Sequence, residues 1–198
     1  MKKSKQETLD TRKRILSTAT RMFLADGLAE TGIASIMSAA GLTQGGFYRH
    51  FRSKEQLIVE ASLAANDHMF DHFNRALAGL SPGQALATAV DMYLSQLDAV
   101  ECGGMCPLPN LGSELRLADR QVRSAAMAGH QRLVLFFQVL ATRAGEADPA
   151  RLAEALVTTM VGAVMLARVA VSVESRQAIL ANCRKSLQAM LPPASGQD

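Results

Sequence analysis

The sequence contains no tryptophan, only two tyrosines and only three cysteines. Three cysteines do not make the paired framework of a disulfide-rich domain, and their spacing does not match a zinc finger. Alternating apolar and polar runs rich in β-branched residues are also missing, which argues against a β-sheet. Alanine, leucine, methionine, arginine and glutamine abound instead. We therefore predict an all-α fold, in a chain long enough for one domain plus a small appended one.

Features typical of membrane proteins, exported proteins and enzymes are scarce. The longest apolar stretch, residues 155–167, is bounded by Glu154 and Arg168 and is shorter than the roughly 20 residues that span a bilayer. The first ten residues, MKKSKQETLD, lack the apolar core of a signal peptide. No Gly-rich phosphate loop, serine nucleophile elbow or paired carboxylates stand out. We expect a cytoplasmic protein with no enzymatic activity, no cofactor and no membrane partner.

Charge is unevenly distributed along the chain, although the overall net charge is only +3. Residues 1–60 carry ten Lys or Arg against six Asp or Glu, a net charge of +4. The rest of the chain carries eleven basic residues against twelve acidic ones, a net charge of −1. Because nucleic acid attracts positive charge through its phosphates, the N-terminal third is where such a partner is expected.

The stretch from Thr31 to Lys54 has the pattern of two short helices joined by a tight turn. Gly41 can take the positive φ that ends the first helix, and Thr43 can cap the second, which is expected over residues 43–51. This order of helix, glycine turn and helix is typical of the helix-turn-helix, whose second helix enters a DNA major groove. The apolar face of the first helix is formed by Ile33, Ile36, Met37 and Ala40.

Two consecutive glycines in the second helix are unusual, because each costs about 1 kcal/mol of helix propensity relative to alanine. That cost is expected where the backbone lies close against another surface, such as a groove wall. Phe47 and Phe51 are expected to anchor the helix to its own domain. Gln44 is the candidate for base reading, since glutamine can bind adenine through two hydrogen bonds. The residues predicted to contact DNA are Thr31, Gly32, Thr43, Gln44, Gly45, Gly46, Tyr48, His50 and Lys54, with Thr31 and Lys54 as phosphate clamps.

These residues carry a resemblance to a known family. The run AAGLTQGGFYRHFRSKEQL resembles the N-terminal domain of TetR-family transcriptional regulators over about the first third of the chain. The resemblance implies a homodimeric repressor that binds a palindromic operator in double-stranded DNA and leaves it on induction. The matching positions are Arg12, Ile15, Ala19, Phe23, Gly27, Ala40, Gly41, Leu42, Thr43, Gly45, Tyr48, Phe51 and residues 54–57.

Helical patterns continue through the rest of the chain. After a basic arm over residues 1–8, the first helix is expected from Thr8 or Asp10 to Asp26, and Ser53 caps a long helix that ends near Ala78. We expect a three-helix DNA-binding domain over residues 9–69 and a regulatory and dimerisation domain over residues 70–191. Further helices are predicted at about 81–100, 107–117, 120–143, 149–171 and 175–191, with Asp119 as the cap of the third, followed by a disordered tail.

The last two predicted helices are short of charge over much of their surface, so they must be buried on several sides. In the TetR family these helices pair with their symmetry mates as a four-helix dimer interface, which implies a homodimer here. An ordinary core helix is the alternative. A dimer also suits an operator with two half-sites, because two half-sites need two reading heads.

Cys102 and Cys106 flank a glycine-containing break ahead of the helix that is expected to begin at Pro107. A thiol at a helix N-terminus can have a lowered pKa. The segment also resembles the Gly-Cys segment of TetR-family regulators that sense electrophiles and oxidants, although Met105 separates the two residues here. Cys106 is therefore predicted to be a sensor thiol that reacts faster than Cys183, with a buried structural cysteine as the alternative. The matching positions are Gly104, Cys106, Leu111 and Glu114.

A small-molecule pocket is expected between the middle helices, since flexible methionine and aromatic side chains suit apolar ligands. Its predicted lining is Met69, Phe73, Met92, Tyr93, Gln96, Phe136 and Phe137, residues that would equally form plain core. His68 and His72 have the spacing of metal ligands, but no third ligand is evident and no metal site is predicted. A ligand-binding helical module without DNA binding and a small all-α enzyme remain the alternative function classes.

Overall fold

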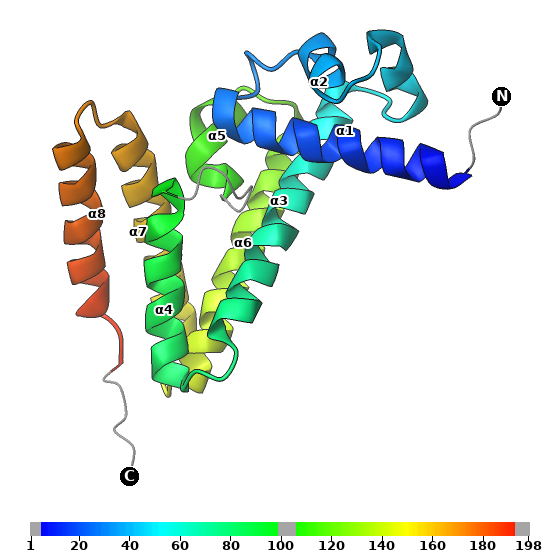
Figure 1. The fold of residues 1–198 in the computed structure, drawn as a ribbon. Helices are drawn as coiled ribbons and strands as arrows, with labels where there is room; N and C mark the ends of the chain where they lie inside the picture. The colour runs from blue at the N-terminus through cyan, green and yellow to red at the C-terminus, as the bar shows by residue number, and fades with distance from the viewer. Residues whose placement is uncertain (1–4, 99–105, 193–198) are drawn as a thin grey trace.

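The computed structural model describes residues 5–98 and 106–192, and every regular element within these ranges is a helix (Figure 1). The all-α prediction is confirmed for this part of the chain. In chain order the elements are α1 (Lys5–Asp26), α2 (Ile33–Ala39), the 3₁₀ helix η1 (Gln44–Arg49), α3 (Lys54–Leu77), α4 (Pro82–Leu94), the 3₁₀ turn η2 (Ser95–Asp98), α5 (Pro107–Leu115), α6 (Arg120–Arg143), α7 (Pro149–Val169) and α8 (Val173–Gln188).

Serine and aspartate side chains cap the starts of several helices, and the caps at Ser53 and Asp119 are at predicted positions. The Ser53 hydroxyl accepts a hydrogen bond from the Gln56 N–H at the start of α3. The Asp119 carboxylate accepts one from the Gln121 N–H at the start of α6, and Asp148 caps α7 in the same way. Because each cap contributes roughly 1 kcal/mol to helix stability, local sequence is enough to set these starts.

Helices α1 and α4 differ from their predicted bounds. Helix α1 begins at Lys5 rather than at Thr8 or Asp10, so part of the expected arm is helical. A hydrogen bond from the Gln6 side chain to the Asp10 carboxylate, 3.0 Å long, spans that added first turn. Helix α4 ends at Leu94 and continues only as the short η2.

Some predictions concern residues outside the described ranges. They are the basic arm over residues 1–4, the glycine-containing break with Cys102 over residues 99–105, and the disordered tail over residues 193–198. These stay predictions.

The hydrophobic core consists of two clusters that divide along α3. Helices α1 and α2, η1 and α3 as far as Ala65 form the first cluster, and α3 from Met69 onward joins α4, α6, α7 and α8 in the second. Four side chains from α5 and α6 nevertheless belong to the first cluster: Leu111, Leu115, Val122 and Ala126. The domain boundary predicted between residues 69 and 70 stays a prediction, and this packing crosses it.

Helices α7 and α8 lie side by side at one edge of the molecule (Figure 1). By length and composition alone α7 could cross a membrane, because the whole helix is longer than the apolar stretch of residues 155–167 identified in the sequence. Its inner face is buried against α4, α6 and α8, as in the core helix of a globular protein. Its outer end and the start of α8 expose five large apolar side chains: Met165, Leu166, Val169, Val171 and Val173.

Candidate functional site

The stretch from α2 to η1 forms two short helices joined by a tight turn. Gly41 takes a φ of +67°, and the next residue, Leu42, donates its N–H to the Met37 carbonyl at 2.8 Å. The predicted turn at Gly41 is therefore present. The second helix is shorter and tighter than the predicted α-helix over residues 43–51, because Gly45 and Gly46 favour the α-helix poorly.

Two phenylalanines fix η1 to the body of its domain, as predicted. Phe47 and Phe51 are buried and their rings stack with centroids 5.7 Å apart. Arg12 of α1 holds the end of η1 from the other side, with its guanidinium 4.5 Å from the centre of the Phe51 ring and its Nε donating to the His50 carbonyl. Its Nη2 also lies 2.7 Å from the Glu60 carboxylate of α3. The sequence does not assign Arg12 this positioning role.

The opposite side of η1 faces solvent. Thr43, Gln44 and Gly45 are exposed, and the Tyr48 side chain is 68% exposed. A Cβ built on Gly45 would meet nothing within 4 Å, so no part of the described protein requires glycine there. The Thr43 hydroxyl makes no capping hydrogen bond, contrary to prediction, and is left available to an outside partner.

The predicted phosphate clamps point inward. Thr31 is 1% exposed, and its hydroxyl donates to the Gly27 carbonyl at 2.7 Å. The prediction that this side chain reaches a phosphate is wrong, because the hydroxyl is used to close the turn between α1 and α2. The Lys54 ammonium donates to the Leu28 carbonyl at 2.6 Å, which uses one of its three N–H groups. A phosphate contact by Lys54 stays a prediction.

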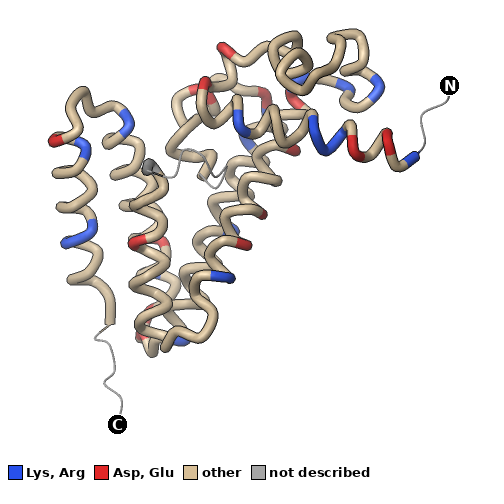
Figure 2. Tube along the Cα trace, viewed as in Figure 1, with Lys and Arg blue, Asp and Glu red and all other residues tan. Residues whose placement is uncertain are grey.

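Three of the remaining candidates flank this surface. Gly32 is the residue before α2 and is partly exposed, as are Gly46 and His50 on η1. A Cβ on Gly46 would lie 3.6 Å from the Met37 side chain, an ordinary contact distance. Figure 2 places basic positions along α1 and near the tip that carries η1. The site is therefore an exposed, partly basic helix end on a buried aromatic base.

Most residues predicted to line a pocket fill the second hydrophobic cluster instead. Met69, Phe73, Tyr93 and Phe137 are all buried there, while Met92 is partly buried against it. A groove lies elsewhere, between the C-terminal part of α3, the start of α4 and α6. It measures about 640 Å³, and Phe136 is the only predicted pocket residue in its lining. The others cannot be told from core by sequence, because both roles use the same apolar side chains.

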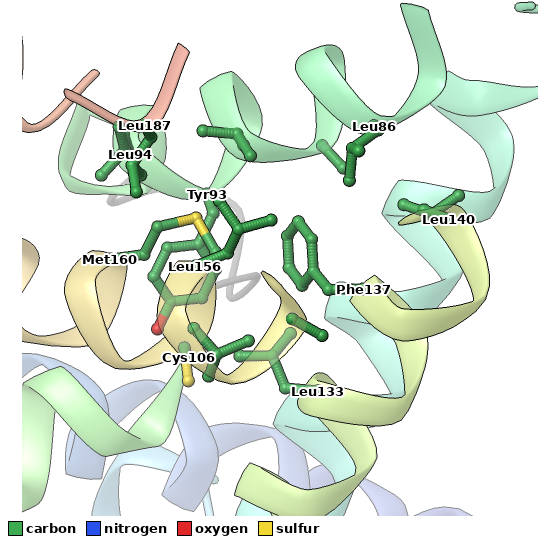
Figure 3. Close-up of a cluster of buried hydrophobic side chains, with 14 of the residues drawn as sticks. Leu86, Tyr93, Leu94, Cys106, Leu133, Phe137, Leu140, Leu156, Met160 and Leu187 are labelled. Carbon is green, nitrogen blue, oxygen red and sulfur yellow. The ribbon is translucent and has the colours of Figure 1, made fainter. Parts of the chain in front are cut away.

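Cys106 lies in a buried position immediately before α5, where its backbone N–H donates to the Gln96 side chain at 2.7 Å. The Tyr93 hydroxyl points toward its sulfur (Figure 3). Burial raises the pKa of the Cys106 thiol, and contacts with the Tyr93 hydroxyl and the Leu108 backbone only partly oppose that rise. The predicted lowered pKa is therefore wrong, because desolvation outweighs the helix dipole. Burial also raises the pKa of the Tyr93 hydroxyl.

Three buried polar atoms beside Cys106 have no hydrogen-bond partner among the described residues. They are the Tyr93 hydroxyl oxygen, Nε2 of Gln96, a residue that is 6% exposed, and Oδ1 of Asn110 in α5. The Asn110 amide nitrogen does donate to the Cys106 carbonyl, at 2.6 Å. Each buried polar group without a partner costs about 1–3 kcal/mol of folding free energy. These unpaired atoms inside an apolar core are therefore unexplained by the contacts of the described residues.

Among the described residues, no group of three or more His, Cys, Asp or Glu side chains is arranged to hold a metal ion. His68 and His72 both lie on the exposed face of α3.

Residues 15–61 match the family model described as bacterial regulatory proteins, tetR family. The HTH-type transcriptional regulator AcrR of Shigella flexneri is 42% identical over 59 residues, which span 30% of this chain and 27% of the relative. The uncharacterized HTH-type transcriptional regulator YxaF of Bacillus subtilis is 30% identical over 60% of this chain and 63% of its own length. The matched sequence thus spans about a quarter to two thirds of these curated relatives.

The likeness extends to nearly the whole fold. A TetR transcriptional regulator from Chloroflexus aurantiacus, known from a crystal structure, superposes with a TM-score of 0.78 and 29% identity. The superposition covers 92% of this chain and 96% of that one. Its N-terminal helix-turn-helix and C-terminal helical domain correspond to the two parts described above, and this family consists of transcriptional regulators rather than enzymes. Residues 15–61 thus belong to the TetR family of bacterial regulatory proteins, and nearly the whole chain has the fold of a TetR regulator.

Proposed function

We propose that this chain is a DNA-binding transcriptional repressor that acts in the cytoplasm as a homodimer and leaves its operator when a small molecule binds. The observation that carries the proposal is the two-sided character of η1. Phe47 is buried beneath it, whereas Gln44, Gly45 and Tyr48 stand exposed on it. Curated relatives that match this domain are named as transcriptional regulators, which supports the same function.

Each exposed residue has a distinct role in the proposal. Gln44 reads a base edge, and Gly45 lets the backbone approach the groove wall. Thr43 and Tyr48 donate hydroxyl hydrogen bonds to phosphates, and Lys54 adds a charged contact. Gly32, Gly46 and His50 border this surface.

Selection of DNA ligands from a random pool, followed by gel shifts, tests the proposal. A palindromic site is expected, whose affinity falls as salt rises. Gln44→Ala should relax the preference at one base pair of each half-site, at a cost of about 1–3 kcal/mol. Gln121→Ala makes the same change on the exposed surface of α6 and serves as the control. Failure of the pool to yield any enriched sequence would overturn DNA reading.

The dimer is assigned to α7 and α8. Their outer surface exposes large apolar side chains next to one another, which favours coverage by a second copy. Val169→Glu should give a monomer in analytical ultracentrifugation, because a charge would be buried at the interface. Met127→Glu, at another exposed apolar position on α6, should leave the dimer intact. A Val169→Glu protein that remains dimeric would move the interface elsewhere.

The inducer is proposed to be an apolar molecule with one polar group. The proposed site is the polar cluster beside Cys106, where Gln96 and Asn110 offer a buried donor and a buried acceptor without partners next to apolar core. The groove beside α3, α4 and α6 includes neither residue in its lining. A panel of apolar amides and alcohols can be assayed for release of the selected operator. A compound that acts on the wild type should lose potency on Asn110→Leu. Equal potency on both would place the inducer's polar group away from this cluster.

A further inference from the structure

The turn between α1 and α2 is held by charged side chains from two other helices. The Ala29 N–H donates to Oε2 of Glu114, a residue of α5, at 2.6 Å. The other oxygen of that carboxylate lies over Gly27, where a Cβ would come within 2.5 Å of it. From α3, the Lys54 ammonium holds the Leu28 carbonyl of the same turn. Three successive residues of the turn, Gly27, Leu28 and Ala29, therefore each lie against a side chain of α3 or α5.

Helix α5 is also held at its opposite end, inside the regulatory part of the molecule. Ahead of its first turn, the Cys106 N–H donates to the buried Gln96 side chain, which belongs to η2 at the end of α4. Between the two ends, Leu111 and Leu115 are buried in the cluster that contains α1 and α3. A nine-residue helix is about 14 Å long, so α5 joins the two contacts as one rigid piece.

We propose that Glu114 and Gln96 are positioning residues that fix the two ends of α5, so that α5 sets the orientation of the α1–α2 turn relative to the regulatory core. The inference rests on the proposed function, because it concerns the presentation of the DNA-reading surface. The inference goes beyond the proposed function by naming the contacts that transmit a change at Gln96 and Cys106 to the α1–α2 turn. Figure 1 shows α5 against the end of α1 from which the chain turns into α2.

The chemistry of the two contacts suits this role. A carboxylate that accepts a backbone N–H makes a short, charge-assisted hydrogen bond, stronger than a bond between neutral groups. Glu114 itself is partly buried, although its bond to Ala29 lies at the exposed side of the turn. The Gln96 contact is buried, and its loss would leave the Cys106 N–H without a partner in an apolar core. Movement of either end therefore displaces the whole helix rather than one side chain.

Loss of the Glu114 contact should weaken operator binding. A dimer presents two reading heads whose spacing must match two half-sites, and a head that is free to reorient must be ordered when it binds. Because the contact is made with the turn and not with the reading helix itself, sequence preference should be unchanged. The expected change is a uniform loss of affinity of about threefold to tenfold.

The test compares Glu114→Ala, Glu114→Gln and Gln96→Leu with the wild type. Amide hydrogen exchange in a peptide spanning residues 27–31 is measured on the free protein, and affinity is measured on the selected operator. Exchange should rise at least fivefold in Glu114→Ala and also in Gln96→Leu, whereas Glu114→Gln should fall between, because its amide oxygen still accepts a hydrogen bond. Asp67→Ala, which removes the exposed ion pair with Arg132, is the matched control and should change neither reading.

The outcomes separate the two proposals. If the wild-type protein enriches no DNA sequence from the random pool, the proposed function is overturned. The hydrogen-exchange measurements on the free protein still test the contacts of α5 in that case. A wild type that binds its operator, with Glu114→Ala equal to it in affinity and in exchange, overturns the role of Glu114. A Gln96→Leu protein that remains folded by circular dichroism, with wild-type exchange over residues 27–31, overturns the connection through α5.

Discussion

Replacement of Gly45 by alanine separates the two reasons for which a glycine can occupy η1. A glycine is needed either by the protein's own backbone or by a partner that approaches it. The φ of Gly45 is not positive, and a Cβ there would meet no atom within 4 Å. The described protein therefore has room for alanine, and the position tests the partner alone.

The effect on stability should be small and favourable. Glycine to alanine at a position that accepts alanine stabilises a protein by about 0.4–1 kcal/mol, chiefly by restricting the unfolded chain. For a chain of this size that corresponds to a rise in Tm of roughly 1–4 °C. If the backbone at Gly45 lies against a groove wall, the added methyl group prevents that approach. We expect a loss of operator affinity of at least tenfold, which corresponds to about 1.4 kcal/mol.

Differential scanning calorimetry and gel shifts measure the two effects on the same preparation. Gly112→Ala is the matched control, since a Cβ on this helical glycine of α5 also meets nothing within 4 Å. It should raise Tm without a change in affinity. A Gly45→Ala protein that binds the operator as tightly as the wild type would refute the close approach of this backbone to DNA. A fall in Tm would refute the claim that the site has room.

Three further predictions follow from the contacts of single side chains. Lys54→Ala should lower the salt dependence of log affinity by about 1, as expected for one lost phosphate contact, and an unchanged slope would show that its bond to Leu28 is its only role. Arg12→Ala should lower the free energy of unfolding by about 1–2 kcal/mol. Arg12→Lys should lower it by less, because lysine keeps the charge near Glu60 but not the flat contact with Phe51. Equal denaturation midpoints for the wild type and both variants would contradict this. Burial raises the pKa of both Cys106 and Cys183, so alkylation of each should be slow at pH 7 and speed up as pH rises toward the raised pKa. Peptide mass spectrometry should find Cys183 labelled first, since Cys106 is only 1% exposed, and the reverse order would restore the sensor hypothesis.

Local features of the fold could be predicted because short-range chemistry determines them. Gly41 ends α2 as expected, and Ser53 and Asp119 cap their helices, since each acts on backbone groups a few residues away. Burial of Phe47 and Phe51 also follows from their spacing along η1. The exposure of Gln44 and Tyr48 on the other side of η1 agrees with the same local pattern.

Contacts between distant segments could not be predicted in this way. Glu114 and Ala29 are 85 residues apart, and no periodicity in the sequence brings them together. The same limit applies to Thr31, whose buried hydroxyl was expected to reach a phosphate. For Cys106 the helix start was predicted well, but its burial depends on Tyr93 and Gln96 from the preceding helical segment. The helix dipole acts locally, whereas desolvation is a property of the assembled fold.

The division of the core along α3 has a consequence for any attempt to isolate the reading head. A fragment that stops at residue 69 lacks Leu111, Leu115, Val122 and Ala126, which complete the first hydrophobic cluster. It would also lack the carboxylate that holds Ala29. The cut surface would be apolar and open to water, so the fragment would be an aggregation-prone reagent. A fragment that keeps the first hydrophobic cluster whole must therefore include α5 and the start of α6, far along the chain from η1.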